Sequence, residues 1–219
     1  PGVDIGANGD QGAAYVFESS GSSWSQLPRL TADDGGVGDF FGYSVAVFGQ
    51  TALAGAPFKR FGSGFLRGGG YIFVKPSASA SNWLLVKKLT LDAEGSDELG
   101  FSVALSANTA ALGTPERTIS GRTGQGAAFV FPRIGQNWFP YQSSVASDGT
   151  AAAHFGYSAA INGDTIVVGA KSEGSGQPGM GEAYFFKNNC GPPLTAFASV
   201  SAASFAPAMP GSTEGALAK

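Results

Sequence analysis

Short apolar runs, each bounded by glycine-rich or polar residues, recur along most of the chain. Each run has the length of a β-strand, and none has the length or the 3.6-residue period of a stable helix. One stretch shows the arrangement clearly, with four successive runs at Ser44–Phe48, Thr51–Ala56, Gly69–Lys75 and Trp83–Leu89. This pattern predicts an all-β protein of short strands joined by tight turns.

The composition of single runs indicates how they are buried. Thr165–Ala170 and Ala127–Phe131 are apolar at almost every position, which predicts strands that are buried on both sheet faces. Ser44 and Ala46 alternate with valines, and small residues at this spacing suit a crowded inner strand. We therefore expect sheets that pack against neighbours on both sides.

The sequence repeats itself every 55–58 residues. The segment FGYSVAVFGQTALAGAP at 41–57 returns as LGFSVALSANTAALGTP at 99–115 and as FGYSAAINGDTIVVGAK at 155–171. A second marker, GAAYVF and its variants, begins at Gly12, Gly68, Gly126 and Gly181, and a third is the tryptophan at 24, 83 and 138. Three markers in one order at one period indicate a repeat protein.

The same positions of each repeat carry aromatic, glycine or proline residues. Glycine permits positive φ or close backbone approach, and proline ends a strand because it cannot donate to the ladder. We expect structural roles for Phe41, Gly42, Gly55, Ala56, Pro57, Gly100, Gly113, Pro115, Phe155, Gly156, Gly169 and Ala170.

Four strands per period, buried on both faces, are typical of a β-propeller blade. Residues 1–39 then form a partial blade, 40–98 and 99–153 form complete blades, and 154–190 form a second partial blade. This gives about three to three and a half blades, where propellers typically have about 4–8. We predict an incomplete propeller of four-stranded antiparallel blades.

Two further expectations follow from this architecture. Aromatic side chains should fill the gap between blades, and we assign this role to Phe41, Tyr71, Phe73 and Trp83. Open strand edges favour pairing, so the remaining propeller blades or another chain should cover them. The Pro-, Ala- and Ser-rich residues 191–219 are interpreted as a linker or as the start of a C-terminal module.

The repeated motifs resemble FG-GAP repeats, which are named for Phe-Gly and Gly-Ala-Pro, here Phe41-Gly42 and Gly55-Ala56-Pro57. The form W-S-Q-x-x-x-L-T-A-x-D-G at 24–35 is similar to bacterial secreted FG-GAP proteins. The resemblance covers roughly residues 1–187. It implies a β-propeller, commonly of seven blades as in integrin alpha chains, with an extracellular role in adhesion or ligand binding.

The resemblance also implies calcium, because many FG-GAP blades carry an Asp-rich calcium loop between their first two strands. Here that connection is only Gly49-Gln50, Ala107-Asn108 or Asn162-Gly163-Asp164. Calcium takes about six to eight oxygen ligands, whereas such short turns fit simple hairpins. We therefore expect no cofactor.

Composition excludes several classes of function. The net charge of −3 gives no basic footprint for nucleic acid. The single Cys excludes an intrachain disulfide framework and a Cys-cluster zinc site, and the single His excludes a multi-His metal site. The longest uncharged stretch, between Lys187 and Glu214, is interrupted by prolines and hydroxyl side chains, so no membrane insertion is expected.

Two groups of loop residues are candidate sites. The basic, aromatic loop 58–68 contains Lys59, Arg60, Phe61 and Arg67. These side chains could bind an anionic glycan or stack on a sugar, or the loop could simply fold over a neighbouring blade. The acidic residues Asp33, Asp34 and Asp39 precede the first Phe-Gly, and they could form a weak cation site or belong to solvated turns.

Three isolated features give weaker signals. His154 could act as a general base, but the sequence has no nucleophile motif G-x-S-x-G, so we interpret it as a loop histidine. Residues 174–179 match G-x-G-x-x-G, but a strand follows where a dinucleotide site needs a helix. Cys190 could pair with a cysteine of another segment or stay free.

The function expected from these observations is a non-catalytic extracellular module for binding, adhesion or scaffolding, secreted or at the cell surface. Its partner would be a protein or glycan on a surface. One alternative is a propeller-based hydrolase or lyase, which would need a cluster of polar residues that the sequence does not show. The other is a purely structural segment of a larger surface protein.

Overall fold

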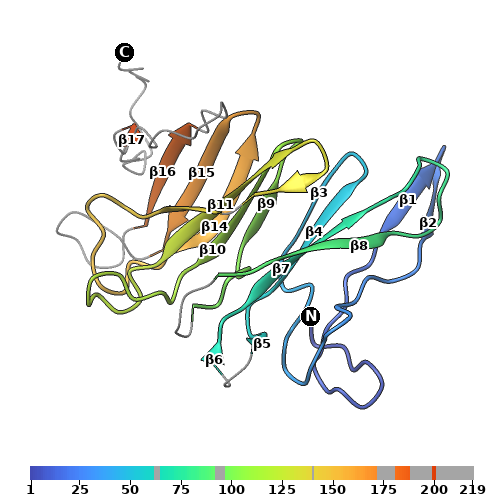
Figure 1. Cartoon of the computed structure of the whole chain (residues 1–219), viewed down its shortest axis with the longest axis horizontal. Coiled ribbons are helices and arrows are strands. Elements are labelled where there is room, and N and C mark those ends of the chain that lie inside the picture. Colours follow the sequence, from blue (N-terminus) through green and yellow to red (C-terminus); the bar gives the residue numbers. More distant parts are fainter. Residues whose placement is uncertain (62–64, 92–96, 140, 172–180, 188–198, 201–219) are drawn as a thin grey trace, which may run out of the picture.

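The structure, a computed structural model, describes residues 1–61, 65–91, 97–139, 141–171, 181–187 and 199–200. These segments contain strands and no helix, and the strands pair antiparallel. In Figure 1 the sheets follow one another across the molecule in chain order, from β1–β2 at one end to β14–β16 at the other. The chain is an incomplete β-propeller of about three blades, as predicted.

The second blade has the four strands that the sequence predicts. They are β3 (Val45–Phe48), β4 (Thr51–Ala56), β7 (Gly69–Val74) and β8 (Leu84–Leu89), paired in that order. β4 ends directly before Pro57, and the β3–β4 turn is Gly49-Gln50, both as expected. A small hairpin of β5 (Arg60–Phe61) and β6 (Phe65–Leu66) lies between β4 and β7.

The third blade differs at its outermost position. It consists of β9 (Val103–Leu105), β10 (Thr109–Thr114), β11 (Ala127–Ile134), β12 (Asn137–Trp138) and β13 (Gln142–Ser144). Both β12 and β13 pair with β11. Pro140 stands between them in the sequence. Because proline has no N–H to donate to a ladder, two short strands take the place of one continuous strand like β8.

The first and fourth blades each contain only part of the repeat. The first consists of β1 (Phe17–Ser20) and β2 (Ser23–Gln26). The fourth consists of β14 (Phe155–Asn162), β15 (Thr165–Ala170), β16 (Glu182–Lys187) and β17 (Ser199–Val200). β17 comes from the segment that we interpreted as a linker or module start, and it supplies an outer strand that the repeat does not predict.

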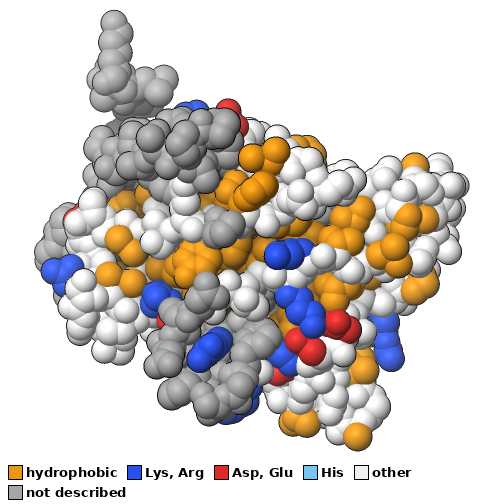
Figure 2. Space-filling view, viewed as in Figure 1, with side chains coloured by type: hydrophobic (Ala, Val, Ile, Leu, Met, Phe, Trp, Pro, Cys, Tyr) orange, Lys and Arg blue, Asp and Glu red, His pale blue; other side chains and the backbone are white. Residues whose placement is uncertain are grey.

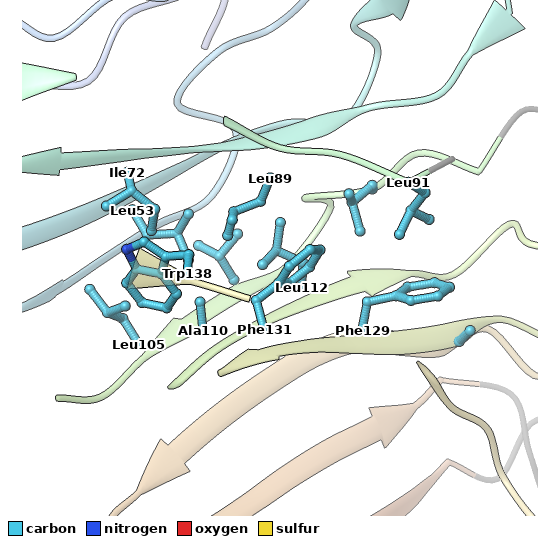
Figure 3. Packing of buried hydrophobic residues seen from close by; sticks show 13 residues of the cluster. Leu53, Ile72, Leu89, Leu91, Leu105, Ala110, Leu112, Phe129, Phe131 and Trp138 are labelled. Atoms are coloured by element: carbon cyan, nitrogen blue, oxygen red, sulfur yellow. The ribbon is translucent and has the colours of Figure 1, made fainter. Parts of the chain in front are cut away.

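The hydrophobic core lies between the blades. Figure 3 shows side chains of the second blade, among them Leu53, Ile72 and Leu89, facing Leu112, Phe129, Phe131 and Trp138 of the third. A similar cluster joins the third blade to the fourth. The stability of the incomplete propeller therefore comes mainly from packing one sheet onto the next.

Aromatic side chains fill the gap between the first and second blades, as predicted. Phe41, Tyr71 and Phe73 are at most 4% exposed, and Trp83 packs against them. The ring centroids of Phe41 and Tyr71 lie 5.3 Å apart, and those of Phe41 and Phe73 lie 6.0 Å apart, both edge to face. This geometry is the favoured one for aromatic pairs.

Two expectations about burial are wrong. Ala127–Phe131 is buried on both faces, but Thr165–Ala170 alternates between buried and half-buried positions, because no sheet of the described chain covers the second face of β15. In β3, Val45 and Val47 are 62% and 66% exposed. This strand is not crowded, because the first blade presents only its outer strands to it.

Candidate ligand-binding face

At one end of the blades, the loop before the first strand of each repeat is hydrogen-bonded to a loop of the preceding blade. The same backbone N–H to carbonyl hydrogen bond recurs from Phe41 to Gln11 (2.8 Å), from Leu99 to Arg67 (3.0 Å) and from Phe155 to Gln125 (2.9 Å). These loops form one surface, here called the loop face: the described residues of 1–12, 31–43, 57–68, 97–101, 115–126, 146–157 and 171. The predicted recognition residues 59–61 and 67 and the predicted acidic residues 33, 34 and 39 belong to it.

Lys59 and Asp39 form a buried ion pair on this face. The Lys59 Nζ lies 2.9 Å from the Asp39 Oδ2, and the two side chains are 8% and 4% exposed. Lys59 also donates to the backbone carbonyl of Asp34, and the Gly36 N–H donates to the Asp39 carboxylate at 2.7 Å. The structure thus joins the predicted recognition residue Lys59 to the predicted acidic site.

The other two acidic residues face a second lysine. The Lys88 Nζ lies 2.7 Å from the Asp33 Oδ1 and 3.0 Å from the Asp34 Oδ2. The Tyr71 hydroxyl donates to the Asp34 Oδ1 at 2.9 Å. Figure 2 shows acidic side chains gathered with basic ones in the region of β8. Ammonium groups therefore neutralise the carboxylates that the sequence suggested for a cation.

These contacts change two pKa values. Burial raises the pKa of Asp34, but hydrogen bonds from Lys88 and Tyr71 and the charge of Lys59 outweigh it, so the pKa is lower than usual. Burial, followed by the nearby Asp34 carboxylate, raises the pKa of Tyr71 far above its usual value. Asp34 is therefore held as a carboxylate and Tyr71 as a neutral hydrogen-bond donor.

The third blade repeats this arrangement with Arg117 and Asp97. They hold the repeat positions of Lys59 and Asp39, and the Arg117 guanidinium lies 2.6 Å from the Asp97 Oδ2. Burial raises the pKa of Asp97 despite the charge of Arg117. In the next repeat Ala153 occupies the position of Asp39 and Asp97, so this ion pair between loops does not recur in the fourth blade.

The other residues of the predicted recognition loop differ in their exposure and contacts. Arg60 is exposed in β5. Arg67 is half-buried, and its backbone N–H donates to the Lys59 backbone carbonyl at 3.1 Å. Phe61 belongs to β5, and its side chain lies outside the described residues. The loop is a short hairpin in which the Lys59 side chain serves packing and charge neutralisation.

The loop face also carries a row of aromatic rings, which the site predictions missed. Tyr43 and Phe101 have ring centroids 4.9 Å apart, and Phe101 and Tyr157 have theirs 5.0 Å apart. Tyr43 and Tyr157 are 40% and 41% exposed. Each ring directly follows the Phe-Gly or Leu-Gly pair of its blade, so the recurrent aromatic at this position was the available signal.

The row continues at both ends. Phe58 makes an edge-to-face contact with Tyr43 at a centroid distance of 6.0 Å. At the other end the Lys171 ammonium lies 4.9 Å from the centre of the Tyr157 ring, which is within cation–π range. We call Tyr43, Phe101 and Tyr157 the aromatic row, and it crosses three blades.

Acidic groups and His154 lie beside this row. Burial and the nearby Glu116 raise the pKa of Glu98, and burial, Tyr157 and Glu98 raise that of Tyr43. The His154 Nδ1 lies 3.4 Å from the Glu116 Oε1. Phe40, Glu98 and His154 hold the same repeat position and share a left-handed backbone, with φ of 52°, 56° and 57°. The backbone before each Phe-Gly or Leu-Gly pair thus has one conformation.

The described residues contain no group of three His, Cys, Asp or Glu side chains placed to hold a metal ion. In the same residues, no helix is long and apolar enough to cross a membrane. The G-x-G-x-x-G match at 174–179 and Cys190 lie outside the described part of the chain.

Comparison with known proteins gives one result. The family model of the FG-GAP repeat matches three times, at residues 24–73, 83–131 and 138–186. Each match begins at a tryptophan marker and ends at the third strand of the following blade. A search of curated proteins found no match.

Proposed function

Because the chain belongs to the FG-GAP repeat family, we propose that it is a non-catalytic, extracellular module that binds a ligand on the loop face. The observation that carries the proposal is the aromatic row, in which three blades contribute rings about 5 Å apart. Exposed aromatic side chains in mutual contact favour recognition, because they offer a large contact area at a low cost in conformational entropy.

The ligand we propose is a protein or glycan at a surface, which would make the chain an adhesion or scaffold module. The rings supply apolar contact, and the Tyr43 and Tyr157 hydroxyls together with Glu98 and Glu116 supply polar partners. Such a mixture of aromatic and polar groups is usual for recognition surfaces. The proposal places the chain outside the cell, in line with the usual setting of FG-GAP proteins.

The test is to screen the purified chain against arrays of glycans and of extracellular proteins. A combined Tyr43→Ala, Phe101→Ala and Tyr157→Ala variant should lose every specific signal. Phe48→Ala is the matched control, because Phe48 is 50% exposed at the end of β3 and lies outside the loop face. A signal that the combined variant retains would place recognition elsewhere and overturn the proposal.

The buried Lys59–Asp39 pair and the partly buried Arg117–Asp97 pair favour a second candidate, a purely structural segment. These pairs direct the charges of the loops toward one another and away from a ligand. A wild-type chain that binds nothing on either array would support this candidate. Turnover of an array component would instead support the hydrolase or lyase alternative.

A further inference from the structure

A groove of about 190 Å³ lies between the outer strands of the second and third blades. Lys87 and Thr90 of the second blade are on one side, and Trp138, Phe139 and Tyr141 of the third blade are on the other. Figure 3 shows Trp138 among the side chains that pack between these two blades. Inner and outer strands of both blades are present, so the groove belongs to a complete contact between blades.

Two neighbouring lysines of β8 point toward different blades. Lys88 directs its ammonium to Asp33 and Asp34 of the first blade. Lys87 lies opposite Ile72 in the β7–β8 ladder, and the Ile72 side chain packs against the third blade. Because directly paired residues of a sheet project from the same face, Lys87 faces the third blade and the groove.

Lys87 brings a positive charge without a partner to the groove. It is exposed, and no described residue forms an ion pair or a hydrogen bond with its ammonium. The described residues that line the groove include no carboxylate. An anionic group that enters the groove would therefore meet a free ammonium, and hydrogen bonds between opposite charges are among the stronger polar contacts.

The wall opposite Lys87 is aromatic. Phe139 is 40% exposed, Tyr141 is half-buried and Trp138 is 8% exposed. The Tyr141 ring is held edge to face against the rings of Phe129 and Phe131, at centroid distances of 5.1 Å and 5.6 Å. These contacts fix the orientation of the Tyr141 ring before a ligand arrives, which lowers the entropic cost of binding.

This combination of residues is particular to one contact between blades. Lys87 corresponds to Pro28 in the first blade and to Gln142 in the third, and Phe139 and Tyr141 correspond to Leu84 and Val86 in the second. The residues that hold blades together do recur, as Ser44 and Ser102 do. Stacking of blades therefore does not require a lysine opposite two aromatic rings at this position.

We infer that the groove is a binding site for an acidic saccharide, such as a chain of uronic acid units. The aromatic wall packs against the C–H face of a sugar ring, the Thr90 and Tyr141 hydroxyls bond to its hydroxyls, and Lys87 binds its carboxylate. A uronic acid offers all three features on one rigid ring, whereas an acidic peptide side chain offers only the carboxylate. No residue named here belongs to the loop face, so the inference stands apart from the proposed function.

The test measures binding to the full chain by titration calorimetry, with a trimer of galacturonic acid, a neutral trimer of galactose and a triglutamate peptide. The acidic trisaccharide should bind. The neutral one should bind at least about tenfold more weakly, because it has no carboxylate for Lys87. Absence of binding by the acidic trisaccharide, equal binding of the neutral one, or tighter binding of the peptide would overturn the inference.

Matched variants locate the site. Lys87→Met removes the charge and keeps the apolar stem, so it should lower the affinity for the acidic trisaccharide to that for the neutral one. Lys187→Met is the control, since Lys187 is an exposed lysine of β16 and does not line the groove. Phe139→Ala should weaken binding of both trisaccharides. Equal weakening by the two lysine variants, or loss of binding in the combined aromatic-row variant, would overturn the inference, and thermal melting verifies that each variant is folded.

Discussion

The Ser102 hydroxyl of the third blade donates a 2.7 Å hydrogen bond to the Gly156 carbonyl of the fourth. Ser44 makes the same bond, of the same length, to Gly100 one blade earlier. Both serines lie two residues after the glycine of the Phe-Gly or Leu-Gly pair. Each repeat therefore carries both the acceptor for the preceding blade and the donor for the following one.

Replacing Ser102 by Ala should destabilise the chain by about 1–2 kcal/mol, because a buried carbonyl loses its partner. Ser158 holds the same repeat position but is exposed and meets no further blade in the described chain, so Ser158→Ala should change the free energy of unfolding by less than about 0.5 kcal/mol. Urea denaturation of the two variants measures the difference. Equal losses would show that the hydroxyl acts within its own blade.

Glycine at the second-strand position is required by the next blade. A Cβ on Gly113 would lie 1.9 Å from the Gly156 carbonyl oxygen, whereas a Cβ on Gly169 would meet only the Ser158 side chain, which can rotate away. Gly113→Ala should therefore cost about 3 kcal/mol or more, because the two backbones must separate. Gly169→Ala should be mild. Thermal melting of both variants checks this contrast, and a mild Gly113→Ala would contradict the close contact between blades.

The period and the alternation of side chains were sufficient to predict the blades, the β4 boundary at Pro57 and the aromatic filling around Phe41. Burial on both faces of Thr165–Ala170 was predicted wrongly, because it depends on a neighbouring sheet and not on the strand itself. β17 could not be predicted, since Ser199 and Val200 have no counterpart in the repeat.

The site residues were individually visible in the sequence, but their partners were not. Lys59 and Asp39 lie 20 positions apart in two loops, and each had a separate interpretation until the fold brought them together. The aromatic row had a signal in the repeat itself, since Tyr43, Phe101 and Tyr157 occupy one position of the period.

Replacing one member of the Lys59–Asp39 pair should destabilise the chain more than replacing both members. Lys59→Met leaves the Asp39 carboxylate buried without its ammonium partner, and such a change costs about 3–5 kcal/mol. The double variant Lys59→Met with Asp39→Leu should recover most of that loss, because it removes both charges. A double-mutant cycle from denaturant unfolding measures the coupling. Additive losses would show that the two side chains do not stabilise each other.

Asp34 and Asp97 should contribute to the pH dependence of stability with opposite signs. The pKa of Asp34 is lowered in the folded chain, so its stabilisation is present above its usual pKa of 3.8 and is lost as the pH falls through the folded value. The pKa of Asp97 is raised, so its contribution is greatest at low pH and declines as the pH rises from 3.8 through the folded value. Asp34→Asn should therefore flatten the rise of stability with pH on the acid side, and Asp97→Asn should steepen it.

Unfolding free energies at a series of acidic pH values, for wild type and both variants, give these slopes directly. Asp4→Asn serves as the control, because the Asp4 carboxylate accepts an exposed hydrogen bond from the Asp10 N–H and takes no part in the ion pairs of Asp34 and Asp97. Slopes that change in the same direction in both variants would show that burial does not outweigh the Arg117 charge at Asp97. Opposite changes would show that the two ion-paired carboxylates of the loop face differ. The partners of Asp34 favour its ionised form, whereas burial disfavours the ionised form of Asp97.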